Sequence, residues 1–449
     1  MIERIDPWVR GKRVLILGFG REGQSTFQVL KRLGSCAAIG IADQREPSGN
    51  VPDGAVWHSG ADYQSHMDEY DVVFKSPGIV LKRPIEEYRC QVLSQAEVFF
   101  QIFRDQIVGI TGTKGKSTIT SLLYHILKSA GKDCTLMGNI GIPAFDRIEE
   151  IDAKTQIVFE LSCHQLEYMT VSPHIAILVN IHEEHLDHYG TMEKYVAAKE
   201  NIFRNQKAED VLVCNVQCLP KEGTCPSHLL KVDLNGANVD INVENSRENA
   251  WAVDYAGERY EIPVDEIRLL GEHNYFDIGM VYAVARMLGV EAEAFSRGLK
   301  TYEPLPHRLQ LIGVKDGVKY YDDSISTIGD TAIQAMKTLI DTDAVLIGGM
   351  DRGIEYDDLI AFLSECSVPH IVLMEETGWR ILREIEEKYP QFSRKERLIV
   401  VDHLEDAVEV AKRVCRSGHS CLLSPAAASY GIFKNFEERG EAFRKMVGL

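Results

Sequence analysis

Short apolar runs alternate with longer segments of helical periodicity along most of the chain. Residues 12–18 form an apolar run between polar and glycine residues, which is typical of a buried parallel strand. Residues 24–33 repeat apolar side chains at helical spacing, and residues 39–43 form a second apolar run that ends in an acid. This order predicts a βαβ unit. A further strand at 71–74 enters the turn 75–78, and we expect this unit to end near residue 105.

The same alternation then starts again. Residues 106–110 predict a strand that enters a glycine-rich turn, and residues 117–129 form an amphipathic helix. Further strands are expected at 156–160 and 174–180. The polar stretch 207–268 has no helical rhythm, and we interpret it as a β-rich insertion. A third unit follows, with strands predicted at 319–323, 344–349, 370–374, 398–401 and 420–424.

These patterns predict an α/β protein of three domains in series, with boundaries uncertain by several residues. Residues 1–105 are expected to form a Rossmann-like domain, and residues 306–449 a second Rossmann-like domain. Residues 106–305 are expected to form a central P-loop ATPase domain that carries the β-rich insertion. In such folds, ligands bind at the carboxyl ends of the strands.

Composition mainly excludes classes of function. The 449 residues suit about three domains, and 49 basic against 67 acidic residues give a net charge of −18. That charge repels nucleic acid and anionic membranes. No run approaches the roughly 20 apolar residues of a membrane span, and the first residues lack the apolar segment of a signal peptide. We therefore expect a cytoplasmic protein that acts on small molecules, with a monomer as the default.

The strongest chemical signal is the segment Gly-Ile-Thr-Gly-Thr-Lys-Gly-Lys-Ser-Thr at 109–118, between a predicted strand and helix. Its backbone N–H groups can hold phosphate oxygens, Lys116 can reach the β- and γ-phosphates, and Ser117 can bind Mg²⁺. The spacing departs from the standard pattern, because Ile110 stands where the first glycine is required. A purely structural glycine turn is the alternative, but it does not explain Gly-Lys-Ser-Thr at the start of the helix.

A second glycine motif lies near the N-terminus. Gly18, Gly20 and Gly23 match G-x-G-x-x-G, and Asp43 stands 20 residues after Gly23. The motif fits a dinucleotide, a sugar nucleotide, or glycines that only allow close packing. An NAD-dependent oxidoreductase is therefore an alternative function, but it leaves the ATP loop unexplained.

Acidic and imidazole side chains follow two of the central strands. Glu160 ends one strand, and a segment from His182 to His188 follows the strand that ends at Asn180. Such ligands near a phosphate loop suit Mg²⁺ or Mn²⁺, although a solvated charged loop is the alternative. Lys199 would, on its own pattern, be an ordinary surface lysine of a helix.

Together these motifs resemble those of the Mur ligases, the ATP-dependent amino-acid ligases of peptidoglycan synthesis. The resemblance covers essentially the whole chain, and the segments 348–353 and 424–440 are most similar to the members that add glutamate. Besides the ATP loop it rests on Gly-Asn-Ile-Gly (138–141), Glu-Leu-Ser (160–162), Asn-Ile-His-Glu-Glu-His-Leu-Asp (180–187), Ala-Ala-Lys (197–199), Gly-Glu-His-Asn (271–274), Pro-His-Arg (306–308) and Asp-Asp-Ser (322–324).

The resemblance implies roles for individual residues. Those implied to bind ATP are Gly112, Thr113, Lys114, Gly115, Lys116, Ser117, Thr118, Asn139, Asn274, Arg308 and Asp323. Those implied to hold two Mg²⁺ ions, with Mn²⁺ as a substitute, are Ser117, Glu160, His185 and Lys199, the last as a carbamate. Those implied to bind the UDP substrate are Gly20, Arg21, Gly23, Asp43, Arg45, Ser76, Pro77 and Gly78. Those implied to bind glutamate are Thr327, Arg352, Ser429 and Phe436, and the catalytic residues are Lys116, His185 and Lys199.

The implied reaction is ATP-dependent addition of D-glutamate to UDP-N-acetylmuramoyl-L-alanine through an acyl phosphate, with ADP and phosphate as products. One departure bears on the glutamate. Where familiar glutamate-adding members read Asp-Ser-Lys, this chain has Ile325 in place of the lysine, so the same ligase using L-glutamate is an alternative. A non-catalytic sugar-nucleotide sensor is another. The residues that together argue against it are Lys116, Glu160, His185 and Lys199.

Overall fold

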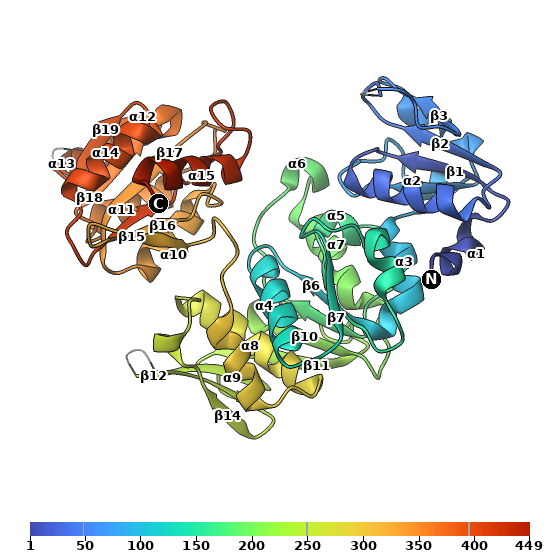
Figure 1. The fold of residues 1–449 in the computed structure, drawn as a ribbon, viewed down its shortest axis with the longest axis horizontal. Helices are drawn as coiled ribbons and strands as arrows, with labels where there is room; N and C mark the ends of the chain where they lie inside the picture. The colour runs from blue at the N-terminus through green and yellow to red at the C-terminus, as the bar shows by residue number, and fades with distance from the viewer. Residues whose placement is uncertain (48, 248–249, 394–395) are drawn as a thin grey trace. The chain divides into compact units, whose positions relative to one another are not determined.

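In the computed structural model, residues 1–47, 49–247, 250–393 and 396–449 are described. Three β-sheets follow one another along the chain, drawn in blue, in green to yellow, and in orange to red in Figure 1. The chain divides into two compact units, which are residues 1–267 with 273–302, and residues 268–272 with 303–449. The predicted α/β class is confirmed, while the domain boundaries at 105 and 305 stay predictions. Among the described residues, we find no helix with the length and apolarity that a membrane span requires.

The first sheet has five parallel strands in the order β3-β2-β1-β4-β5. Apolar runs at β1 and β4 pair in the centre, as expected for strands that helices cover on both faces. The strands are β1 (Arg13–Leu17), β2 (Ala38–Ala42), β3 (Ala55–His58), β4 (Val72–Lys75) and β5 (Gln91–Leu93). The helices are α1 (Asp6–Val9), α2 (Arg21–Leu33) and α3 (Gln95–Phe103).

The second sheet has nine strands in the order β14-β13-β12-β11-β10-β9-β6-β8-β7. The polar stretch interpreted as a β-rich insertion of the central domain contains strands, and they continue this sheet, because β10 pairs with β9 on one side and β11 on the other. The strands are β6 (Ile107–Thr111), β7 (Cys134–Gly138), β8 (Gln156–Glu160), β9 (Ile175–Leu178), β10 (Val211–Asn215), β11 (His228–Leu234), β12 (Ile241–Arg247), β13 (Ala250–Tyr255) and β14 (Glu258–Glu261). The helices are α4 (Lys116–Ser129), α5 (Cys163–Leu166), α6 (Leu186–Tyr189), α7 (Met192–Arg204), α8 (Glu272–Met287) and α9 (Ala292–Thr301).

The third sheet has six strands in the order β15-β16-β20-β17-β18-β19, and only the β15–β16 pair is antiparallel. Two separate groups of buried apolar residues belong to it. The strands are β15 (Gln310–Lys315), β16 (Val318–Asp322), β17 (Thr342–Gly348), β18 (His370–Met374), β19 (Leu398–Val401) and β20 (Ser420–Leu423). The helices are α10 (Gly329–Thr338), α11 (Asp357–Glu365), α12 (Glu375–Lys388), α13 (Pro390–Ser393), α14 (Leu404–Val414) and α15 (Phe436–Val447).

The first two sheets share one apolar core within the first unit. The rings of Phe99 and Phe100 on α3 pack against Phe159 of β8, with centroids 5.8 and 5.0 Å apart. Burial of such rings contributes strongly to stability. The link between the two sheets is therefore part of the core rather than a loose tether.

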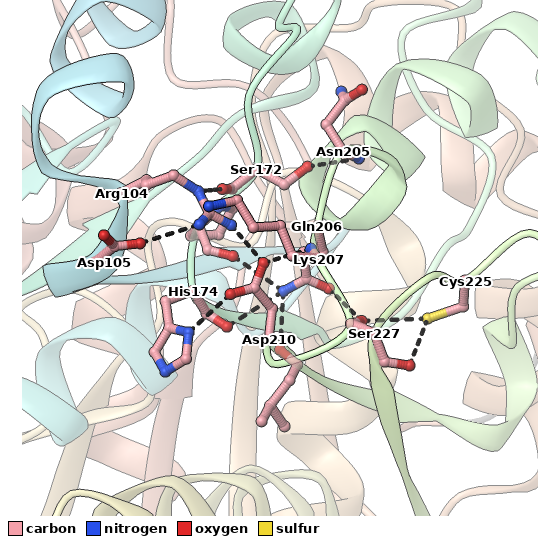
Figure 2. Close-up of polar contacts among 12 residues, drawn as sticks. Arg104, Asp105, Ser172, His174, Asn205, Gln206, Lys207, Asp210, Cys225 and Ser227 are labelled. Carbon is pink, nitrogen blue, oxygen red and sulfur yellow. Dashed lines mark hydrogen bonds and ion pairs between the residues drawn. The ribbon is translucent and has the colours of Figure 1, made fainter.

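A buried carboxylate ties together the segments around the start of β9 and β10 (Figure 2). Asp210 accepts hydrogen bonds from the Arg104 guanidinium and from the Lys207 N–H at 2.6 Å, and His174 Nδ1 lies 2.8 Å from it. Burial alone would raise the pKa of Asp210, but these hydrogen bonds hold it below its ordinary value. This charge network fixes the amino ends of strands whose carboxyl ends carry the candidate site.

Candidate active site

The glycine-rich segment forms a loop between β6 and α4, as predicted. Gly115 closes it with φ +84°, a left-handed conformation that glycine adopts without strain. The side-chain oxygen of Asn180 accepts hydrogen bonds from the backbone N–H groups of Thr113 (3.0 Å) and Lys114 (2.8 Å). Asn180 therefore fixes the loop from the end of the neighbouring strand, a role that we did not predict. The loop and the first turn of α4 form a site of the kind that binds phosphate.

Two lysines meet at one carbonyl of this loop. Lys116 Nζ donates to Gly112 O at 2.9 Å, and Lys199 Nζ donates to the same oxygen at 2.7 Å. Lys199 is only 1% exposed, so it is not the surface lysine that its local pattern suggested. Burial, and then the charge of Lys116, lower the pKa of Lys199 to about 7, and burial also lowers the pKa of Lys116. Lys199 thus has a reactive neutral form near neutral pH.

The oxygen ligands predicted for a metal lie beside the loop. Glu160 ends β8 and is 1% exposed; its Oε1 accepts a hydrogen bond from Asn139 Nδ2 at 2.7 Å. Its Oε2 is buried and has no hydrogen-bond partner among the described residues. A buried carboxylate oxygen without a partner is costly, so this atom fits a cation ligand. Ser117 is the second residue of α4, where its hydroxyl suits the same ion.

A cavity of about 380 Å³, the size of a small-ligand site, is lined by Lys116 and Lys199 and by Asn139, the partner of Glu160. His185 lines it from the residue before α6 and has φ +58°, a conformation that non-glycine residues adopt mainly where function or context requires it. The other side chains and backbone groups that line it come from Pro77, Gly78, Lys116, Asn139, Ser162, Cys163, His164, Glu184, Tyr195 and Lys199.

A second cavity of about 390 Å³ contains most of the residues expected to bind the UDP substrate. Ser76 Oγ donates to Gly18 O at 3.0 Å, which joins the two turns that form its floor. Asp43 accepts from the N–H groups of Phe19 (2.8 Å) and Arg45 (2.9 Å) and so shapes the glycine loop. The predicted residues that line the cavity are Gly20, Arg21, Asp43, Arg45, Ser76, Pro77 and Gly78.

The remaining residue of that motif, Gly23, has a packing role. A Cβ at Gly23 would lie 2.1 Å from Gly18 O, so α2 could not approach β1 with any other residue there. Close helix–strand packing is the ordinary task of the third glycine in such a motif. Contact between Gly23 and the UDP substrate stays a prediction.

Lys75 is a residue that sequence reasoning missed. It is 5% exposed, and its Nζ donates to Pro77 O at 3.0 Å and Ser76 O at 3.3 Å, so it supports the turn shared by both cavities. Burial lowers its pKa to about 8. Glu22, in the glycine turn of the second cavity, accepts a hydrogen bond from Gln165 at 2.7 Å, and burial raises its pKa. The only sequence signal for Lys75 was its place at the end of an apolar strand.

Asp323 lies in the second unit, at the end of β16. It accepts a hydrogen bond from Leu309 N at 3.0 Å and another from Ser424 Oγ at 2.7 Å, which joins the linker after Arg308 to the end of β20. Burial raises its pKa from 3.8 to about 6. The Nε of Arg308 is buried without a hydrogen-bond partner among the described residues. The predicted contacts of these residues, and of Asn274 on α8, with ATP stay predictions.

The predicted glutamate residues also lie in the second unit. Arg352 donates to Thr327 O at 2.9 Å, so these two are neighbours. The backbone carbonyl of Phe436 accepts a hydrogen bond from Ser324 Oγ at 2.8 Å, and Ser324 in turn binds the fully buried Arg439. Helix α15 therefore fixes the segment around Ile325. The start of this helix belongs to the segment 424–440, one of the two segments most similar to the glutamate-adding members.

Comparisons with known proteins test the resemblance. Residues 110–285 match the family described as the Mur ligase middle domain. The UDP-N-acetylmuramoylalanine–D-glutamate ligase of Acetivibrio thermocellus is 32% identical over 98% of this chain and 97% of its own. The enzyme of the same name from Geobacillus kaustophilus is 34% identical over 97% of each chain. This chain belongs to the Mur ligase family.

Solved structures show the same fold. The MurF ligase of Acinetobacter baumannii is 16% identical, with a TM-score of 0.64 over 100% of this chain and 98% of its own. The UDP-N-acetylmuramate–alanine ligase of Thermotoga maritima is 17% identical, with a TM-score of 0.61 over 97% and 98%. The fold of this Mur ligase is therefore the one predicted from its motifs.

Membership in the Mur ligases makes this chain a ligase, and the oxidoreductase alternative has no support. The first unit brings together the loop, Glu160, His185 and Lys199 in one region, as the motifs implied. Sequence reasoning missed Asn180, Lys75, Cys163 and His164. Cys163 and His164 line the first cavity, whereas Asn180 and Lys75 support the loop and the turn. Their neighbours in the chain were recognised, but these contacts depend on the geometry of the turns.

Proposed function

We propose that this protein joins D-glutamate to UDP-N-acetylmuramoyl-L-alanine in an ATP-dependent reaction of peptidoglycan synthesis. The observation that carries the proposal is near full-length identity of about one third to enzymes named for that reaction. The reaction activates the substrate carboxylate as an acyl phosphate, which the glutamate amine attacks. An amide, ADP and phosphate result.

The loop and Lys116 serve the phosphoryl transfer. In the described conformation Lys116 Nζ is bound to Gly112 O and to Thr113 O, both at 2.9 Å. A phosphate oxygen is a stronger acceptor than either carbonyl, so Lys116 would turn from the loop to the bound ATP. There it stabilises the charge that develops as the γ-phosphoryl moves to the substrate carboxylate.

The donor set also fits Mg²⁺. Ser117 and Glu160 would hold one ion and His185 a second. The buried Oε2 of Glu160, which has no hydrogen-bond partner among the described residues, is the observation that supports the first of these assignments. Bound there, Mg²⁺ supplies positive charge next to the phosphate oxygens. The number of ions and the use of Mn²⁺ belong to this proposal.

Lys199 is proposed to become a carbamate. Its buried amine is in the neutral form for part of the time near pH 7, and only that form attacks CO₂. The ammonium of Lys199 first loses one proton. The neutral amine then forms a nitrogen–carbon bond as one C=O π bond of CO₂ opens, and a second proton leaves the nitrogen, so that a carbamate anion replaces the ammonium cation beside Lys116. The exchange replaces repulsion between two ammonium groups by attraction and adds oxygen ligands beside the Mg²⁺ site.

The two cavities suggest the path of the UDP substrate. Pro77 and Gly78 line both of them. The uridine diphosphate is proposed to occupy the cavity with Asp43 and Arg45, so that the muramoyl-alanine end passes this turn toward Lys116. Lys75 donates hydrogen bonds to carbonyls of this turn and so holds it in position. It would thereby fix how far the reacting carboxylate extends into the first cavity.

Glutamate is assigned to the second unit through Thr327, Arg352, Ser429 and Phe436. The guanidinium of Arg352 is the cation that suits a glutamate carboxylate.

The proposed substrates, ATP and a UDP-linked sugar, favour a reaction in the cytoplasm. One chain carries every predicted substrate contact, which favours a monomer.

The test is phosphate release from ATP with UDP-N-acetylmuramoyl-L-alanine and either D-glutamate, L-glutamate or no amino acid. We expect release that requires D-glutamate, with the product mass showing one added glutamyl group. Release without incorporation, or none with either isomer, would contradict the proposal.

L-glutamate is the second candidate, because Ile325 replaces the lysine expected in this segment. The N–H of Ile325 donates to His307 O at 3.2 Å, so the backbone of this segment is fixed, although the side chain of Ile325 lacks the positive charge of a lysine. A preference for L-glutamate in the same assay would decide for this candidate.

A further inference from the structure

A cluster of thiol and imidazole groups lies in the first cavity, apart from the groups assigned to phosphate. Cys163 and His164 open the short helix α5, and His185 precedes α6. One ligand atom from each of the three side chains lies within 4.8 Å of the other two. Cys163 Sγ is 3.6 Å from His164 Nδ1, and the rings of His164 and His185 are 4.8 Å apart. All three residues line the cavity.

These ligands differ in chemistry from those around Glu160. A thiolate and two imidazoles favour Zn²⁺ and related thiophilic cations, whereas Mg²⁺ prefers oxygen. Ligand atoms in a tetrahedral zinc site lie roughly 3.3–3.8 Å from each other, as follows from bond lengths of about 2.0–2.3 Å. The Cys163–His164 separation of 3.6 Å falls within this range. The ligand atoms of the other pairs lie within 4.8 Å of each other, so side-chain rotations that bring them closer by at most about 1 Å close the site around an ion.

The surroundings position two of the three groups, Cys163 and His164, while His185 is exposed. Ser162 and Gln165 form a reciprocal cap at the start of α5, which fixes the turn that carries Cys163. The His164 ring also packs against His188, with centroids 4.4 Å apart. His188 in turn lies 3.1 Å from a Glu167 carboxylate oxygen. Because Cys163 and His164 are already positioned, these two ligands lose little conformational entropy on binding.

We propose that Cys163, His164 and His185 form a binding site for a thiophilic divalent cation, of which Zn²⁺ is the representative. On binding, the Cys163 S–H bond breaks, a sulfur–metal bond forms, and the proton passes to solvent. Because His185 is also assigned to Mg²⁺, the two ions compete, and Zn²⁺ inhibits the ligase. This inhibitory consequence rests on the proposed function, but the binding site does not.

Binding is tested with Co²⁺ alone, in the absence of substrates. We expect wild-type protein to develop a thiolate-to-cobalt charge-transfer absorption that Zn²⁺ abolishes and Mg²⁺ does not. Cys163→Ser should lack the band, and His164→Gln should weaken Co²⁺ binding more than about tenfold. The matched control is Cys218→Ser, because Cys218 Sγ lies 4.0 Å from Cys214 Sγ and these two cysteines form a second thiol pair in the same unit that could bind cobalt.

The outcomes test the cation site and the inhibition by Zn²⁺ separately. A missing thiolate band, or one that survives in Cys163→Ser and disappears in Cys218→Ser, overturns the site whatever the activity of the enzyme. Inhibition is then measured for each protein relative to its own activity without Zn²⁺. We expect Zn²⁺ to inhibit wild type at least tenfold more strongly than Cys163→Ser, with relief by excess Mg²⁺. Equal inhibition of both proteins overturns the competition, and lack of ligase activity leaves the cobalt result to decide the site.

Discussion

At the scale of single residues, the candidate site depends on charges that are buried before any substrate binds. Lys116 and Lys199 share one carbonyl oxygen, and Glu160 has a buried oxygen without a partner among the described residues. Each of these arrangements costs free energy in the free protein. ATP, Mg²⁺ and a carbamate would each remove one of these costs, so the site favours bound states over the free one.

Lys116 provides the clearest test of this view. We expect Lys116→Ala to lower kcat about 10²–10³-fold, because one charge that stabilises the transition state is lost. Lys128→Ala, on the exposed side of the same helix, is the matched control and should keep wild-type activity. Steady-state kinetics and circular dichroism of both variants give the measurement. Activity of Lys116→Ala within tenfold of wild type would remove it from the reaction.

Asp323 gives a prediction about pH. Because burial raises its pKa from 3.8 to about 6, the folded state binds more protons than the unfolded state between these values. The free energy of unfolding should therefore fall as pH rises through this window, by at most about 3 kcal/mol. Asp323→Asn lacks this dependence, so the difference between wild type and variant should change between pH 4 and 6. Thermal melts across that range measure it; parallel curves would contradict the raised pKa.

At the scale of helices and strands, periodicity predicted the central parallel strands well. Their residues are apolar on both faces, which gives a strong local signal. The strands β3, β5, β7 and β15, each at an edge of its sheet, were missed, because strands of this kind depend on pairing with a neighbour rather than on their own pattern. The antiparallel extension β12–β14 was recognised as β-rich, but its pairing with the central sheet was not, since register is a tertiary property.

In the candidate site, the motifs predicted those cavity residues whose position is set by the backbone of a turn or loop. Pro77 and Gly78 were found because turn residues are recognisable. The burial of Lys75 and the contact of Asn180 with the loop were not predictable, because both depend on how neighbouring strands end at one edge. The family resemblance supplied Lys199, which local pattern alone placed on the surface.

Helix α15 offers a test of packing around the second unit's loops. A Cβ at Gly440 would lie 2.2 Å from His307 Nδ1 and 2.3 Å from an Asp322 oxygen, which are themselves 2.7 Å apart. Gly440→Ala should therefore destabilise by about 1–3 kcal/mol, although alanine normally favours a helix. Lys445→Ala on the exposed face should stay within about 0.5 kcal/mol. Thermal denaturation compares them, and a stabilised Gly440→Ala would show that α15 does not lie against this pair.

At the scale of the whole molecule, the two compact units have separate cores. The second unit has its own six-stranded sheet with two apolar groups of residues, while the first two sheets share one core. An independent core is the main requirement for independent folding.

We expect the fragment 303–449 to fold by itself, because nearly all of the second unit lies within it. It should show a cooperative thermal transition and α/β circular dichroism. A matched fragment cut inside the first unit, residues 1–105, should be less stable, because α3 loses its packing against β8. A non-cooperative melt of 303–449 would show that its core needs the rest of the chain.

The last strand of the nine-stranded sheet has a consequence for solubility. β14 stands at the end of the strand order, and such an edge can template the addition of a strand from another copy. It is only four residues long, and it carries Glu258, Arg259 and Glu261. Arg259 also forms ion pairs with Glu244 and Asp254 on the two preceding strands. An incoming strand would have to bury this charged group, so the edge protects the protein from aggregating as its concentration rises.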